Sequence, residues 1–109
     1  MDNVYAVIMY SYDSYTEMIE NIGDMCLFDY NPISSPLAIF DNEESAVKMV
    51  IARAEHEEKT LQLLNKPYWL DTDSVIYNDG KELKASIIHL LSDDSVLLWV
   101  VCPYKVERG

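Results

Sequence analysis

Histidine is the side chain best suited to acid–base chemistry near neutral pH, and this chain has two histidines. His56 lies among Glu55, Glu57 and Glu58, so we expect it to be solvated on a charged helix. His89 alternates with apolar residues in a β-rich run, which favours a half-buried structural histidine over a base or a metal ligand.

Two aspartates offer a second arrangement with possible chemistry. Asp71 and Asp73 stand two residues apart in the segment LDTDS, a spacing that some metal sites use. Hard cations require several oxygen ligands, and the LDTDS segment has neither the turn glycine nor the later glutamate of a calcium loop. We therefore predict a turn that carries aspartates, with no metal and no cofactor.

The sequence contains none of the motifs GxSxG, P-loop, GxGxxG or HExxH. We predict that the protein is not an enzyme. If it were one, His89 with Asp71 or Asp73 would be the candidate catalytic residues.

The two cysteines, Cys26 and Cys102, are too few for a disulfide framework or a four-ligand zinc site. Both stand beside apolar residues, so we expect buried free thiols rather than a disulfide. The N-terminus lacks a basic segment of the secretory type, and no apolar run approaches the roughly 20 residues of a membrane span. A cytoplasmic protein that binds no membrane is the expectation.

The charge of the chain is strongly acidic and uneven. The formal net charge is −11, and residues 1–47 hold nine acids and no Lys or Arg, whereas the rest holds ten acids and all eight bases. Such a charge argues against direct binding of nucleic acid, since phosphates are bound by Lys and Arg. It favours a basic protein surface as the partner.

The centre of this acidic segment is a predicted helix from Tyr15 to Ile22, introduced by Ser14 and Glu17 at the spacing of a capping box. Tyr15, Met18, Ile19 and Ile22 would form its buried face. Four acids would follow the opposite face: Asp13, Glu17, Glu20 and Asp24.

Like charges at this helical spacing repel, and Asp24 would stand at the wrong end of the helix dipole. We therefore predict that these acids bind a partner, together with Tyr12 and, in the following loop, Asp29 and Tyr30. The alternative is a solvated face that keeps the protein soluble.

The elements that must position these residues follow from apolar periodicity. Val4–Tyr10 is predicted to be a buried strand, Met25–Pro36 a surface loop and Leu37–Phe40 a short strand. A long helix begins after Asp41 as its N-cap, with Glu44 three residues on, and continues to Asn65 before Pro67. Its apolar stripe includes Leu64.

The C-terminal third predicts a β-meander. Val75–Asn78 and Lys81–Leu91 flank the hairpin turn Asp79–Gly80. After a turn at Ser92–Ser95, Val96–Cys102 is apolar on both faces and predicts a central strand that ends at Pro103. The fold class is therefore α+β: one domain with a mixed or antiparallel sheet of four or five strands, packed by one long and one short helix.

The segment Leu37–Val50 (LAIFDNEESAVKMV) and the opening VYAVIMY, in an acidic chain rich in Tyr, Asn and Ile, resemble small early proteins of tailed phages. The resemblance covers roughly the first 60 residues and assigns a role to no single residue. Several of those proteins inhibit host defence or host nucleases, so the resemblance implies a protein inhibitor that acts on a nucleic-acid-handling host complex in the host cytoplasm.

The sequence thus predicts an acidic inhibitor that occludes a basic surface of a host protein. The alternative is a small interaction module or homodimer that uses an apolar helix or sheet edge, without enzymatic activity.

Overall fold

The structure is a computed structural model, and it describes residues 2–26, 36–78 and 80–106. It contains one antiparallel sheet with the strand order β2-β1-β5-β4-β3. The strands are β1 (Asp2–Tyr12), β2 (Ala38–Phe40), β3 (Tyr68–Asn78), β4 (Lys81–Leu90) and β5 (Val96–Val106). The predicted α+β class and the C-terminal meander are confirmed.

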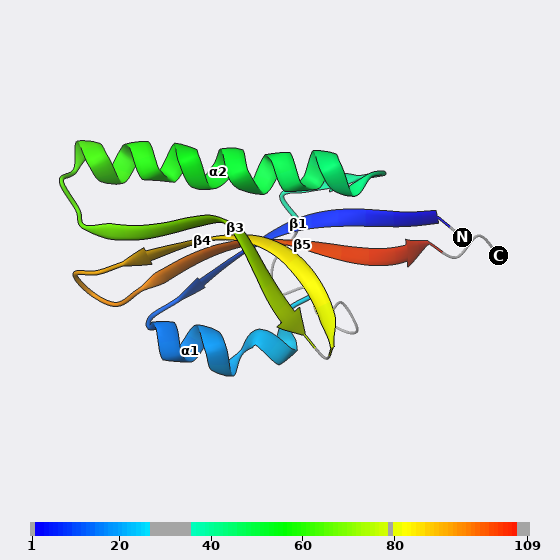
Figure 1. The fold of residues 1–109 in the computed structure, drawn as a ribbon, viewed down its shortest axis with the longest axis horizontal. Coiled ribbons are helices and arrows are strands. Elements are labelled where there is room, and N and C mark those ends of the chain that lie inside the picture. The colour runs from blue at the N-terminus through cyan, green and yellow to red at the C-terminus, as the bar shows by residue number, and fades with distance from the viewer. Residues whose placement is uncertain (1, 27–35, 79, 107–109) are drawn as a thin grey trace.

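Helices cover the two faces of the sheet unequally. The long helix α2 (Glu43–Leu63) lies along one face, and the short helix α1 (Tyr15–Glu20) and the 3₁₀ helix η1 (Ile22–Asp24) lie under the other (Figure 1). Successive strand residues point to opposite faces, so β1 sends Ala6 and Ile8 toward α1 and Val7 toward α2. The sheet therefore separates two cores.

The central strand is β5, as its apolar run predicted. Its residues Val96, Leu98 and Val100 belong to the core under α1, and Trp99 and Val101 belong to the core under α2. A strand that is buried on both faces has no polar face, which explains the sequence VLLWVVC.

Pro103 does not end β5, contrary to the expectation. It lies opposite Tyr5 of β1, and the strand continues to Val106. The register between β4 and β5 runs only as far as Ala85 and Val100 among the described pairs. Beyond that point the backbone of β5 has β1 as its ladder neighbour, so a residue without an N–H is tolerated there.

The LDTDS segment is not a turn, which corrects the prediction for Asp71 and Asp73. Both residues lie inside β3, at a register shift between Asp71 and Ser74 that marks a β-bulge. The Asp71 carboxylate accepts a hydrogen bond from the backbone N–H of Asp73 at 3.0 Å. Aspartates and a bulge on an edge strand both hinder pairing with another chain.

Both predicted boundaries of the long helix also change, and so does the burial of one residue of its stripe. The N-cap of α2 is Asn42 rather than Asp41, the helix ends at Leu63 rather than Asn65, and Leu64 is 58% exposed rather than buried. Asn65 follows in the left-handed region with φ 54°, a conformation that ends a helix before Pro67 is reached.

The two cysteines form a disulfide, whereas free thiols were predicted. The chain passes from β1 through α1 and η1 and returns under β5, which places the Cα atoms of Cys26 and Cys102 5.5 Å apart. This separation is the usual one for a disulfide. The residues are separated by 76 positions, so their proximity has no local signal in the sequence.

Candidate protein-binding surface

The N-cap of α1 is Ser14, as the sequence predicted, whereas Glu17 accepts from the residue before the N-cap and not from the N-cap itself. The Ser14 side chain accepts a hydrogen bond from the N–H of Glu17 at 3.0 Å, and the Glu17 carboxylate accepts one from the N–H of Asp13 at 3.1 Å. Both bonds satisfy backbone donors at a helix N-terminus, where a negative charge is also favoured by the helix dipole. Glu17 therefore has a structural role that the sequence argument from charge repulsion had not assigned to it.

The four acids do not form one helical row. The α-helix ends at Glu20, and Asn21 is both its C-cap and the N-cap of η1. The Asn21 side-chain N–H donates to the carbonyl oxygen of Glu17 at 2.7 Å. Asp13 precedes the N-cap, and Asp24 lies in η1. Asp13, Glu20 and Asp24 are nevertheless exposed along one stretch of chain that has no Lys or Arg.

Tyr12 is half-buried beneath this acidic stretch. Its ring stacks on Tyr10 with centroids 6.2 Å apart, and both rings pack against the core under α1. Burial, which is the main cause, and the neighbouring Tyr10, Glu17 and Asp24 together raise the pKa of Tyr12 to about 12. The negative charges of Glu17 and Asp24 therefore oppose ionisation of the Tyr12 hydroxyl, as its burial does. Asp29 and Tyr30, the other predicted contact residues, lie outside the described residues.

An exposed surface beside α1 was not predicted. Tyr15 was expected in the core, but it is 39% exposed, and its ring lies 5.2 Å from that of His89 on β4. Trp69 of β3 lies directly opposite His89 in the sheet register and is 48% exposed. Ile19, one helical turn after Tyr15, is 49% exposed. We call these four residues the Tyr15–Trp69 surface.

His89 is half-buried, as predicted, and its partner is Asp94. Its Nε2 atom lies 2.6 Å from the carboxylate of Asp94, which belongs to the turn between β4 and β5. Asp94 has a φ of 65°, a left-handed conformation that aspartate tolerates better than most residues. Leu83, Ala85 and Ile87, on the same face of β4 as His89, are buried in the core under α1, whereas Leu91 after the strand is 56% exposed.

The sequence could have indicated Trp69 as a surface residue only if β3 had been predicted to start at Tyr68. The bulge hides that strand, because the apolar–polar alternation breaks at Asp71–Ser74. The proximity of Tyr15 to His89 depends on how α1 packs on the sheet, and no short sequence pattern reports it.

A hollow lies where β4 and β5 diverge. Its volume is about 270 Å³, and its walls include the disulfide. Three side chains fix the chain beside it: the Asn78 amide donates to the carbonyl oxygen of Met25, the Tyr104 hydroxyl donates to that of Cys26, and the Tyr10 hydroxyl accepts from the N–H of Cys26, each at 2.9 Å. This arrangement anchors the end of the η1 segment to the sheet.

Within residues 2–26, 36–78 and 80–106, no group of three or more metal-ligating side chains is found. In the same ranges, no helix is long and apolar enough to cross a membrane. His56 is exposed on α2, as predicted.

Neither a protein-family model nor a curated protein nor a solved structure matches this chain.

Proposed function

We propose that this protein binds a basic surface of another protein and occludes it. One observation carries the proposal: the segment that runs through α1 and η1 presents the exposed carboxylates of Asp13, Glu20 and Asp24, and residues 1–47 contain no Lys or Arg. Exposed acids without local counter-charges create a negative potential that speeds and orients association with a positive surface.

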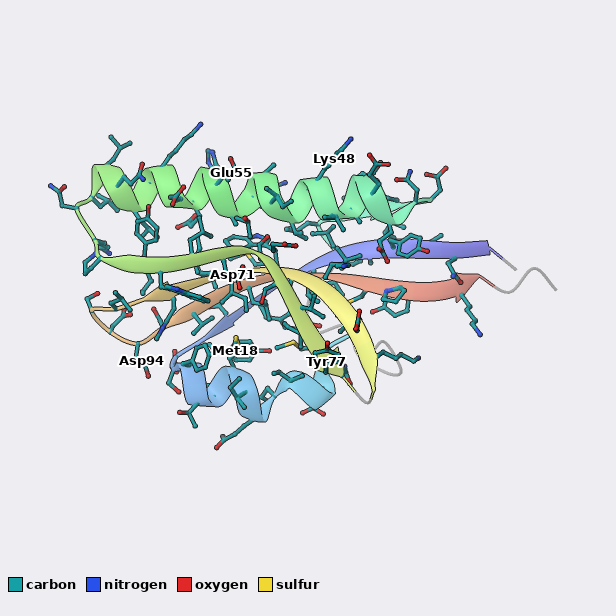
Figure 2. The ribbon with its side chains drawn as sticks, in the orientation of Figure 1. Met18, Lys48, Glu55, Asp71, Tyr77 and Asp94 are labelled. Carbon is teal, nitrogen blue, oxygen red and sulfur yellow. A yellow bond between two sulfur atoms is a disulfide. The ribbon has the colours of Figure 1, made fainter. Side chains whose placement is uncertain are left out.

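Three bases lie on the opposite face of the sheet, whereas Lys81 lines the hollow beside Met25 and Cys26. Lys48, Arg53 and Lys59 belong to α2, on the opposite face of the sheet. Figure 2 shows Lys48 and Glu55 pointing away from the sheet on that helix. Lys48 forms a surface ion pair with Glu44 at 3.2 Å, so the outer face of α2 is mixed in charge. The α1 side is therefore the side with an unbalanced negative charge.

The chemistry of the α1 side suggests the class of partner. Proteins that bind nucleic acid carry clusters of Lys and Arg, and a row of carboxylates can compete with phosphates for them. The resemblance to early phage proteins implies that the partner is a nucleic-acid-handling host complex and that the host cytoplasm is the place of action. Both are part of this proposal.

The test uses immobilised full-length protein and an extract of the host cell. We expect capture of a basic protein that elutes as the salt rises from about 50 mM to about 500 mM and that added duplex DNA displaces. The variant Glu20→Lys with Asp24→Lys reverses two exposed charges without touching the Glu17 cap, and it should lose the capture.

The matched control is Glu44→Lys with Glu55→Lys, which changes the net charge equally but on α2. It should capture the same protein as the wild type. Equal capture by the α1 variant, or failure of DNA to compete, would refute the proposal.

A second candidate function rests on the edge strand. β3 forms one edge of the sheet, and Tyr77 on it is 66% exposed. The part of this edge beyond the bulge at Asp71–Ser74 can pair with a second copy of the chain, which gives the homodimer or interaction module. Sedimentation equilibrium distinguishes the two: a dimer that persists at high salt and dissociates in Tyr77→Lys would support the edge-strand function.

A further inference from the structure

The Tyr15–Trp69 surface joins three elements into one exposed contact area. Tyr15 and Ile19 come from α1, His89 from β4 and Trp69 from the edge strand β3. Tyr15 and Trp69 both border His89, one through a ring contact at 5.2 Å and the other through the strand register. Large apolar side chains that remain exposed and adjacent are typical of a contact surface.

Carboxylates stand at two positions around this surface. Asp94 holds His89 through one of its oxygens, and its side chain is 57% exposed. Asp71 follows Trp69 on the same face of β3, since it lies opposite Ile87, whose side chain is in the core under α1. Figure 2 shows Asp94 near the start of α1 and Asp71 on β3.

β4, which contributes His89, carries two bases, but Lys84 alternates with Leu83 and Ala85 and therefore faces the α2 side, and Lys81 lies opposite Asn78 at the far end of β3. The sequences of α1, of β3 and of the turn from Leu91 to Ser95 contain neither Lys nor Arg. A partner side chain that approaches here meets aromatic rings and the carboxylates of Asp71 and Asp94, while Lys66 stands beside the turn and acts on Asp93.

Arginine fits this combination best. Its guanidinium group is planar, stacks on aromatic rings and binds carboxylates through several N–H donors, whereas the ammonium group of lysine is a compact and more strongly hydrated charge. We propose that the Tyr15–Trp69 surface binds an arginine-bearing segment of the partner, with the guanidinium against Trp69 or Tyr15 and paired with Asp71 or Asp94. This inference rests on the proposed function and adds the residue type that is recognised.

The experiment uses two peptides with blocked ends, tetra-arginine and tetra-lysine, which carry the same charge. The protein has two tryptophans, and Trp99 is 3% exposed, so a change in tryptophan fluorescence on peptide addition reports on Trp69. At low ionic strength we expect tetra-arginine to bind about 3- to 10-fold more tightly than tetra-lysine and to change this fluorescence.

Calorimetry then measures the variants, since it needs no tryptophan. Trp69→Ala should reduce the affinity for tetra-arginine to the level of tetra-lysine, and Trp69→Phe, which keeps a ring, should retain most of the preference. The control is Leu63→Ala, which removes an apolar side chain that is 85% exposed at the end of α2 and should change neither affinity. Near-ultraviolet circular dichroism confirms that each variant is folded.

The outcomes separate this inference from the proposed function. Equal binding of the two peptides, unchanged in Trp69→Ala, would mean recognition by charge alone; it would overturn the arginine site and leave the occlusion proposal in place. Absence of binding by either peptide would also overturn the arginine site. The occlusion proposal is decided independently, by the captured partner and the Glu20→Lys, Asp24→Lys variant.

Discussion

Two tyrosine hydroxyl groups lie in unusual environments on the α1 side of the sheet. Burial is the main cause that raises the pKa of Tyr104, and the nearby Tyr10 adds to it; its hydroxyl donates to the carbonyl oxygen of Cys26. Burial also raises the pKa of Tyr12, and there the charges of Glu17 and Asp24 contribute as well. The charges of Glu17 and Asp24 on the acidic surface thus contribute to the raised pKa of the half-buried Tyr12.

The first prediction concerns Tyr12. Its pKa of about 12 in the folded protein exceeds the ordinary value of 10.0, so folding favours the neutral hydroxyl. The stability that this preference contributes is fully present below pH 10 and is lost as the pH rises toward about 12. Tyr12→Phe should therefore shift alkaline unfolding to higher pH. A residue-specific NMR titration checks the pKa, and titration of Tyr12 near its ordinary value of 10.0 would contradict the prediction.

The long helix begins at a different residue from the one that its sequence suggests. In DNEES both Asp41 and Asn42 are suitable N-caps, and the spacing of Asp41 to Glu44 favours the first. In the structure the Asn42 side chain accepts from the N–H of Ser45 at 2.8 Å, and the Asp41 carboxylate instead accepts from the Asn42 amide at 2.9 Å. The N-cap of α2 therefore depends on where the chain leaves β2 and enters the helix.

The second prediction tests this assignment. Asn42→Ala should lower the free energy of unfolding by about 1 kcal/mol, because a helix N–H loses its acceptor. Asp41→Ala should cost only a few tenths of that amount, since Asp41 caps no backbone donor among the described hydrogen bonds. Urea unfolding of the two variants makes the comparison, and a larger loss in Asp41→Ala would reverse the assignment.

The third prediction concerns the link between the η1 segment and β5. The Cys26–Cys102 disulfide closes a loop with a sequence separation of 76. A cross-link over so long a loop restricts the unfolded chain, and its loss should cost about 2–5 kcal/mol. Urea unfolding with and without a reductant measures this difference. Cys26→Ala with Cys102→Ala should match the reduced protein and be insensitive to the reductant; equal stability of the oxidised and reduced protein would contradict the prediction.

Local patterns predicted those elements whose burial is strongly periodic. The run VLLWVVC indicated a central strand, and the stripe through Ala46, Val50 and Ala54 indicated the long helix. The patterns failed where distant contacts decide the outcome. Pro103 is tolerated inside β5 because β4 has diverged there, and the disulfide forms because two segments far apart in sequence meet under the sheet.

One part of the candidate surface could be predicted from the sequence, and another part could not. The exposed acids Asp13, Glu20 and Asp24 follow from the absence of any base before Lys48. Trp69 and Tyr15 could not be placed beside His89, because the bulge conceals the start of β3 and the packing of α1 is a tertiary feature.

For the molecule as a whole, charge separates the two sides of the sheet. The α2 side carries interspersed acids and bases, and Glu44 with Lys48 is one pair at helical i,i+4 spacing. The α1 side carries acids on elements without bases. In the proposed function, this asymmetry orients the protein toward a positively charged partner before contact is made.

The fourth prediction follows from that asymmetry. A net charge of −11 on a chain of 109 residues opposes the compact state by self-repulsion, and salt screens this repulsion. The Tm should therefore rise between about 20 mM and about 300 mM NaCl. The salt-dependent increase in Tm should be smaller in Glu20→Lys with Asp24→Lys, because this pair relieves repulsion where no base compensates. It should be larger in Glu44→Lys with Glu55→Lys, because this pair changes a surface that is already mixed in charge. Differential scanning calorimetry of the three proteins at both salt concentrations measures the effect. An equal response of the two variants would show that the repulsion is spread evenly over the molecule, and it would remove the electrostatic reason for assigning partner binding to the α1 side.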